Sequence, residues 1–189
     1  MNILRKIISG GQTGVDQAAL RAARDCGLEI GGWCPPGRVC EAGVIPAEFP
    51  LEETEQDRSL GASDVPRSQR TEWNVRDSDG TLVIRAGEAS HRDAATEEAR
   101  DPGTEWAMQC AQQLGRPLLV CDLSDPNAKQ KIREWLSRFR IKVLSVGGPS
   151  ESTSPGIGDR AYRLLRGVFD DLLSGSTVCQ ITRQSRWSA

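Results

Sequence analysis

The sequence predicts an α/β fold in which a doubly wound, mainly parallel β-sheet carries helices on both faces of a single domain. Three observations predict it. Short apolar runs alternate along the chain with longer segments of helical periodicity, which is the pattern of successive βαβ units. Several apolar runs end in glycine or polar residues, as strands do where a sheet opens onto a cleft. The chain has 189 residues, enough for one domain with a sizeable core.

Five short apolar runs are the predicted strands. Each is bounded by turn residues and has the length of a buried strand. The runs are Leu4–Ser9, Glu29–Trp33, Thr81–Ile84, Leu118–Asp122 and Lys142–Val146, and Glu29–Trp33 has the weakest pattern.

Four longer segments are the predicted helices. The first two are each followed by glycine, the residue type preferred after a helix C-terminus. Asp125 is a candidate N-cap for the third, and the fourth has apolar residues spaced to bury one face. The segments are Asp16–Cys26, Glu105–Leu114, Pro126–Phe139 and Gly156–Leu173.

Two polar stretches predict long loops. Residues 51–70 are polar and contain Gly, Ser and Pro, and residues 85–102 are highly charged without an apolar period. Long loops in compact domains are functional or mobile, so we expect mobile loops near residues 52–70 and 85–102. We expect one ligand-binding domain over residues 1–175 and a fraying tail over 176–189, which has no clear periodicity.

Composition and charge exclude several classes of function. The formal net charge is -2, whereas a general nucleic-acid-binding protein normally has a basic excess. No run of 18 apolar residues is present to form a transmembrane helix, and the first residues lack the apolar stretch of a signal peptide. We therefore expect a cytoplasmic protein whose partners include neither nucleic acid nor a membrane.

The cysteines do not predict a metal site. None of the six forms a Cys-x-x-Cys pair, and the only histidine is His91, so the spacing of a zinc site is absent. In a cytoplasmic protein such thiols are most often reduced and buried. We expect this of most of the six, which are Cys26, Cys34, Cys40, Cys110, Cys121 and Cys179.

The stretch IISGGQTGVDQAAL, residues 7–20, joins the first predicted strand to the first predicted helix through three glycines. Glycines let backbone N–H groups approach a ligand closely, and a helix N-terminus adds partial positive charge. Ser9 and Thr13 can add hydroxyl donors. The pattern favours a site for phosphate or another oxyanion, although it is neither GxGxxG nor a Walker A motif. The alternative is a tight strand-to-helix turn in which Asp16 caps the helix.

A second loop of this kind is VGGPSESTSPGIGDRAY, residues 146–162. Its hydroxyl groups again suit an anion, and Pro155 fits a first helical turn. Glu151 is an acid within this anion-friendly loop. It either accepts a hydrogen bond from a sugar or pterin N–H group or caps its own backbone.

A third stretch, PGTEWAMQCA, begins at residue 102. Gly103 and Thr104 open the predicted helix, and Glu105 lies in its first turn. This is either a capped helix start or a third turn that faces the ligand.

The segment RTEWNVRDSDGTLVI, residues 70–84, carries four side chains that suit a ligand site. Arg76 can bind a phosphate through its planar guanidinium group, and Trp73 can stack on a flat heterocycle. Asp77 and Asp79 can cap the backbone or bind a metal. The alternative is a helix that ends in an Asp-Gly turn, with Trp73 in the core and Arg76 paired to an acid.

The segment GGWCPPGRVCEAGVIP, residues 31–46, contains a Pro-Pro-Gly turn followed by Arg38. A basic group at this point after the second strand region can complete an anion pocket. The alternative is an ordinary surface arginine.

In this order, the segments resemble the putative molybdenum carrier family of the lonely-guy-like (SLOG) Rossmann superfamily. The matching stretches are SGGQTGVDQAAL, GWCPPGR followed by GVIP, RTEWNVRDSDGTLVI, Trp135-Leu136 and VGGPSESTSPGI, and together they span about residues 4–173. The resemblance implies a Rossmann-like fold and a homo-oligomer, either a dimer or a tetramer. It also implies a pocket for the molybdenum cofactor (molybdopterin) or for a nucleotide-like phosphate ligand.

The resemblance also implies which residues bind the ligand. The first glycine-rich loop would cradle the anion, the segments at 38 and 74–76 would face the pocket, and the second glycine-rich loop would close the other side. No metal ligand is predicted. With the third turn included, the candidates are Gly10, Gly11, Gln12, Thr13, Gly14, Asp16, Arg38, Asn74, Arg76, Gly103, Thr104, Gly148, Ser150, Glu151 and Ser152.

The chain departs from the superfamily at the third turn. Enzymatic relatives cleave the N-glycosidic bond of nucleoside monophosphates and carry a PGGxGTxxE signature, of which only PGTE, residues 102–105, is present here. The main expectation is therefore a small-molecule carrier rather than an enzyme. One alternative is a nucleotide N-glycosidase or phosphohydrolase with Glu105 or Glu151 as the acid/base. Another is a nucleotide sensor whose moving part is the charged segment 85–101.

Overall fold

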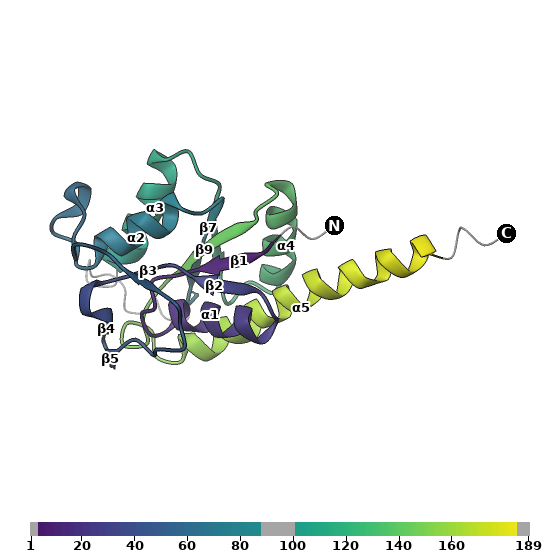
Figure 1. Cartoon of the computed structure of the whole chain (residues 1–189), viewed down its shortest axis with the longest axis horizontal. Helices are drawn as coiled ribbons and strands as arrows, with labels where there is room; N and C mark the ends of the chain where they lie inside the picture. The colour runs from purple at the N-terminus through teal and green to yellow at the C-terminus, as the bar shows by residue number, and fades with distance from the viewer. Residues whose placement is uncertain (1–3, 88–100, 185–189) are drawn as a thin grey trace.

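A computed structural model describes residues 4–87 and 101–184 of the chain, with side chains as far as residue 174. Figure 1 shows a sheet with helices packed on both sides and a last helix that projects from the body. The elements are β1 (Lys6–Ile8), α1 (Val15–Asp25), β2 (Glu29–Gly31), β3 (Trp33–Cys34), η1 (Pro36–Arg38), β4 (Val39–Cys40), β5 (Gly43–Val44), β6 (Glu52–Glu53), η2 (Leu60–Ala62), α2 (Ser68–Arg76), β7 (Gly80–Arg85), α3 (Pro102–Gln113), β8 (Leu118–Asp122), α4 (Ala128–Arg138), β9 (Val143–Gly147) and α5 (Ile157–Gln184).

Five parallel strands form the central sheet in the order β2-β1-β9-β7-β8. Ile7 of β1 lies between Ile30 of β2 and Leu144 of β9, and β9 in turn pairs with β7. The chain winds from β1 through α1 to one edge of the sheet and from β7 through α3 to the other. The predicted doubly wound α/β fold is confirmed, and the carboxyl ends of all five strands meet at one edge of the sheet.

The helices divide between the two faces of the sheet (Figure 1). Helices α1, α4 and α5 pack with Leu82 and Leu119 in the largest apolar cluster. Helices α2 and α3 form a second cluster that includes Trp106 and is contacted by Leu118. Leu118 and Leu119 are neighbours in β8 and therefore point to opposite faces, so the two clusters lie on opposite sides.

The polar segment 51–70 is not one open loop. It contains β6, η2 and the start of α2. The Thr54 amide donates to the carbonyl of Cys34 over 2.9 Å, and the Ser59 amide donates to the buried hydroxyl of Ser68 over 2.8 Å. These bonds to distant elements fix the path of the segment, which its polar composition does not reveal. Most of the charged segment 85–102, with His91, lies outside the described residues.

Two predicted boundaries are wrong. The predicted strand 29–33 is split at Gly32, whose φ of 126° separates β2 from β3. Helix α5, predicted to end at Leu173, continues to Gln184. No proline follows Pro155 in the sequence, and a glycine such as Gly175 costs a helix only about 1 kcal/mol.

The described cysteines have no disulfide partner. Cys34, Cys40, Cys110 and Cys121 are buried and Cys26 is partly exposed, whereas Cys179 lies beyond the described side chains. Burial raises the pKa of Cys110 to about 12. These surroundings agree with the expectation of buried thiols. Among the described helices, none is long and apolar enough to cross a membrane.

Candidate functional site

The two glycine-rich loops lie against each other at the carboxyl edge of the sheet, because β1 and β9 are neighbours. The Val15 amide donates to the carbonyl of Pro149 over 3.2 Å, and the Glu151 amide donates to the Thr13 hydroxyl oxygen over 3.2 Å. Gly14 permits this approach. Its φ is 74°, and a Cβ atom there would lie 2.5 Å from the carbonyl oxygen of Pro149. The structure therefore brings together two loops that are more than 130 residues apart.

A carboxylate from a third segment sits where these loops meet. Glu41 lies in the turn of the antiparallel β4–β5 hairpin. Its Oε1 accepts from the Thr13 hydroxyl and, over 3.0 Å, from the Ser152 amide, and its Oε2 accepts from the Ser152 hydroxyl. Desolvation would raise the pKa of Glu41, but hydrogen bonds from Ser152 and Thr13 outweigh it and lower the pKa to about 2. The loops thus bind an anion in this structure, and that anion is part of the chain.

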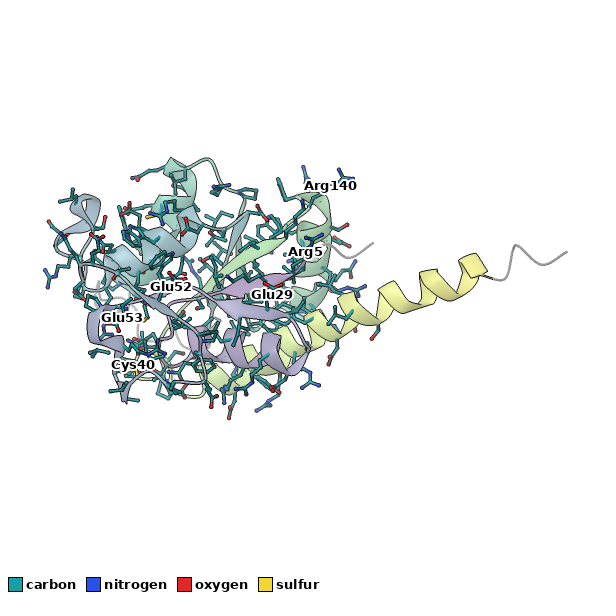
Figure 2. The ribbon with its side chains drawn as sticks, viewed as in Figure 1. Arg5, Glu29, Cys40, Glu52, Glu53 and Arg140 are labelled. Carbon is teal, nitrogen blue, oxygen red and sulfur yellow. The ribbon has the colours of Figure 1, made fainter. Side chains whose placement is uncertain are left out.

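Figure 2 labels Cys40, the residue before Glu41, beside the loop that leads into α5. Gln12 adds a further link to this turn. Its Oε1 accepts from the amide of Thr13 and from the amide of Glu41, each over 3.0 Å. The turn is therefore joined to the first glycine-rich loop by backbone as well as side-chain bonds.

Glu151 caps the helix that follows its own loop. Its Oε1 accepts from the Gly156 amide, and its Oε2 accepts from the Gly158 amide over 3.2 Å. Of the two interpretations of Glu151, the structure supports the backbone cap. The N-terminus of α5 is thus satisfied by a carboxylate five to seven residues away in sequence.

A groove of about 600 Å³ runs beside these carboxylates. It is bounded by both glycine-rich loops, the hairpin turn and the first turns of α1 and α5. The lining residues are Thr13, Gly14, Gln17, Arg21, Glu41, Ala42, Glu151, Ser152, Gly158 and Asp159. Four predicted ligand-binding residues, Thr13, Gly14, Glu151 and Ser152, are among them.

Arg21 is the cation of this groove, and the sequence analysis missed it. Its Nε is buried and has no hydrogen-bond partner within the described part of the chain. Its guanidinium carbon lies 5.6 Å from the ring centroid of Tyr162. The available signal is helical spacing, since Gln17 and Arg21 are four residues apart on one face of α1. Glu41 gave no comparable signal, because the hairpin that places it cannot be inferred from local pattern.

Asp16 forms an ion pair with Arg70, whose side chain passes beside Gly10. Asp16 is only 2% exposed, accepts from Arg70 Nη1 over 2.7 Å and accepts from the Gln12 amide over 3.3 Å. Burial raises the pKa of Asp16, and Arg70 opposes that rise. The Arg70 guanidinium passes over Gly10, where a Cβ atom would lie 1.9 Å from its Nη1. Gly10 therefore makes room for Arg70, a partner that the sequence analysis did not identify.

Three other loop residues pack inside the protein rather than line the groove. Gly11 has a φ of 75°, and a Cβ atom there would lie 2.6 Å from a methyl carbon of Leu51. A Cβ atom on Gly148 would lie 2.4 Å from the carbonyl oxygen of Ile84. Ser150 is 9% exposed, and its hydroxyl lies 3.1 Å from that of Ser152. Ser150 thus supports a groove residue from behind.

Arg38 and Asn74 make contacts that hold the chain together. The Arg38 guanidinium donates to the carbonyl oxygens of Leu51, Pro46 and Phe49, over 2.8, 3.2 and 2.9 Å. Asn74 is buried and exchanges two hydrogen bonds of 2.9 Å with the backbone of Trp33. The structure does not bring either side chain to the groove.

Arg76 follows the structural alternative given for its segment, whereas Trp73 is half-buried rather than in the core. Arg76 is paired with Asp77 over 2.7 Å and lies over the ring of Trp73 at 4.7 Å. Trp73 makes an edge-on contact with Trp33, with ring centroids 4.7 Å apart. Asp79 accepts from two backbone amides of the β9 region, Lys142 and Val143. Arg76 is therefore engaged with an acid outside the groove.

The third predicted turn is a capped helix start. Asp101 accepts from the Gly103 amide over 3.1 Å and from the Thr104 hydroxyl over 2.8 Å. Glu105 is exposed and lies 3.6 Å from Arg85. None of these residues lines the groove. Within residues 4–87 and 101–174, no cluster of three His, Cys, Asp or Glu side chains is arranged to hold a metal ion.

Comparisons with known proteins agree with this architecture. Residues 7–169 match the model of the circularly permutated YpsA SLOG family. The chain also resembles the crystal structure of the "Putative molybdenum carrier protein" from Syntrophus aciditrophicus SB. The two are 36% identical, the match covers 89% of this chain and 96% of the other, and the TM-score is 0.74. A comparison with curated proteins gives no match.

The family match spans both glycine-rich loops, the hairpin that carries Glu41 and all five strands of the central sheet. The structural match extends over nearly the whole of both chains. Fold and sequence therefore lead to the same assignment. The chain belongs to the circularly permutated YpsA SLOG family, whose Rossmann-like architecture it shares.

Proposed function

We propose that the protein binds a small molecule through an anionic group held between the β1–α1 and β9–α5 loops. The environment of Glu41 carries this proposal. Three donors, the Thr13 hydroxyl and the amide and hydroxyl of Ser152, converge on the two oxygens of one anion. Backbone amides and hydroxyls in such a cradle suit a phosphate or another oxyanion.

The ligand we favour is the molybdenum cofactor or a related phosphorylated pterin or nucleotide. The relative from Syntrophus aciditrophicus, named "Putative molybdenum carrier protein", supports a ligand that contains molybdenum. The chemistry of the groove fits the phosphate end of such a molecule, since Thr13 and Ser152 supply donors and Arg21 supplies a positive charge. A volume of about 600 Å³ is within the range of small-molecule sites.

A carrier is favoured over a hydrolase by the contacts of the two candidate acids. Both carboxylate oxygens of Glu151 accept amide hydrogen bonds at the start of α5. Glu105 lies outside the groove in an exposed pair with Arg85. Neither contact prepares a carboxyl group to exchange a proton with a ligand between the loops.

Thermal shift tests the proposal. AMP, inorganic phosphate, molybdate and molybdopterin are added separately to the protein. A ligand present at 100 times its Kd stabilises the folded state by about 2.7 kcal/mol, or roughly 5–10 °C in Tm. We expect such a rise with a phosphate-bearing ligand and its loss in Arg21→Ala.

Two variants provide matched controls. Arg24→Ala removes an exposed arginine from the same helix, and Arg76→Ala removes the arginine that the sequence analysis placed at the ligand. Both are expected to retain the full rise in Tm. The absence of a rise with every ligand, or an equal rise in Arg21→Ala, would contradict the proposed site.

A further inference from the structure

We propose that Glu41 is a latch, an internal anion that holds the tip of the β4–β5 hairpin on the groove until the anionic group of a ligand replaces its carboxylate. The inference rests on the proposed function and adds how access to that site is controlled. It also defines the part of the ligand that displaces Glu41, an oxyanion with at least two acceptor oxygens.

The hairpin tip is an exposed segment between two buried residues, so it can move while its ends stay in place. Residues 41–44 are exposed, and the side chain of Val44 is 72% exposed. The residues on either side, Cys40 and Ile45, are buried at 4% and 1% exposure. A Cβ atom on Gly43 would have no neighbour within 4 Å. The tip is therefore anchored at both ends while its own residues pack against little else.

Among the described residues, the hydrogen bonds of Glu41 all lead to the candidate site. Its carboxylate accepts from Thr13 and Ser152, and its amide donates to Gln12. The side-chain donors belong to two loops that are separated by more than 130 residues in sequence and come together only in the fold. The Glu41 carboxylate therefore joins three segments, the two glycine-rich loops and the hairpin, through hydrogen bonds to a single side chain.

The latch has the chemistry of a displaceable ligand. Every donor to the carboxylate is a neutral hydroxyl or amide, and among the described residues no Lys or Arg forms an ion pair with Glu41. A phosphate group offers more acceptor oxygens and more charge than a carboxylate. It can accept from the same donors, and the attraction of Arg21 is opposed in part by Glu151 and Asp159, which also line the groove. When phosphate binds, it replaces the Glu41 carboxylate. The donors therefore have an anionic acceptor both in the free protein and in the complex.

Calorimetric titration with inorganic phosphate and AMP tests the latch in the full chain. Glu41→Ala removes the internal competitor, so we expect the Kd of this variant to fall about two- to fivefold below that of the wild type. Glu48→Gln is the control, since Glu48 is an exposed carboxylate that pairs with Arg24 away from the groove. Its Kd is expected to equal that of the wild type. Glu41→Gln, which keeps the shape of the side chain, is the second variant in case Glu41→Ala does not fold.

Acetate provides an independent readout. It is a free carboxylate of the size that Glu41→Ala leaves out, so we expect it to raise the Tm of this variant and leave the wild type unchanged. Phosphate should then compete with acetate. If wild type and both Glu41 variants bind phosphate and AMP with the same Kd, the latch is overturned while the proposed function stands. If none of them binds either probe, the proposed function fails.

Discussion

Glu41 and Glu151 are two carboxylates that accept hydrogen bonds at adjoining loops, but the sequence separation from their donors differs. Glu151 accepts amide hydrogen bonds from Gly156 and Gly158, residues of its own loop and helix. Glu41 accepts from Thr13 and Ser152, which lie 28 and 111 residues away in sequence. One carboxylate is bound to its donors by a short stretch of chain, and the other reaches them from a separate hairpin.

This difference in connectivity separates a structural contact from an exchangeable one. A local cap re-forms whenever its helix forms, because few backbone dihedrals lie between carboxylate and donor. A remote carboxylate on an exposed hairpin tip can leave while the core stays folded, because the buried residues that flank the tip keep their places. Hence the same hydrogen-bond chemistry gives a fixed helix N-terminus at Glu151 and, in our proposal, a removable occupant at Glu41.

Separation of the two loops should have the largest effect, because the donors to Glu41 come from both of them and the loops also bond to each other directly. Gly14→Ala places a Cβ atom about 2.5 Å from the Pro149 carbonyl at a φ of 74° and is expected to cost about 3 kcal/mol or more. Urea denaturation measures the free energy of unfolding. Gly27→Ala is the matched control, since Gly27 has a φ of 78° with no atom near its Cβ position. Equal losses in the two variants would mean that the contact between the loops contributes nothing.

Removal of the Glu151 cap should have a smaller effect. It should lower the free energy of unfolding without changing the affinity for phosphate. Glu151→Ala leaves the Gly156 and Gly158 amides without their acceptor and is expected to cost about 1–2 kcal/mol. Acetate should not restore its Tm, in contrast with Glu41→Ala. As a control, Glu134→Ala at an exposed position of α4 should change the free energy of unfolding by less than about 0.5 kcal/mol. A gain in phosphate affinity in Glu151→Ala would remove the distinction between the two carboxylates.

The same distinction explains what the sequence could predict. Alternation of apolar runs and helical segments was sufficient for the five strands of the sheet and for α1, α3, α4 and α5, because those signals are local. Helix α2 was given only as an alternative for its segment. The two glycine-rich loops were identified because each glycine pattern lies within a few residues. Arg38, Asn74 and Arg76 were expected at the ligand, but they do not line the groove. The contacts of Arg38 with Leu51 and of Asn74 with Trp33 form only in the folded chain, and Arg76 pairs with its neighbour Asp77.

Glu41 and Arg70 were missed because their partners lie far away in the sequence. The hairpin carries Glu41 to Thr13 and Ser152, and α2 carries Arg70 over Gly10 to Asp16. Both act only across long separations in sequence, and neither lies in a motif that marks its role. Arg21 could have been found, since a helix that starts at a glycine-rich loop presents its third and seventh residues, here Gln17 and Arg21, on the same side.

The smallest effect we expect is the dependence of the Glu41 contact on pH. The pKa of Glu41 is lowered to about 2 in the folded protein, whereas an unfolded glutamate titrates near about 4.3. Because the folded pKa is the lower one, the unfolded state takes up the proton first as the pH falls. The stabilisation is therefore complete above about pH 5.5 and is lost between about pH 5 and 2. Since the residue is exposed, its size is at most about 1 kcal/mol.

The measurement is the difference in the free energy of unfolding between wild type and Glu41→Gln, by urea denaturation from pH 7 to pH 3. This difference should be constant down to about pH 5.5 and then shrink. Val44→Ala, a change at the same hairpin tip that removes no ionisable group, should give a difference that does not vary with pH. If the two variants follow the same pH course, the carboxylate of Glu41 does not hold the tip. Glu41 could then no longer be compared with Glu151 as an exchangeable carboxylate. The hairpin would be held on the groove by packing and backbone hydrogen bonds alone.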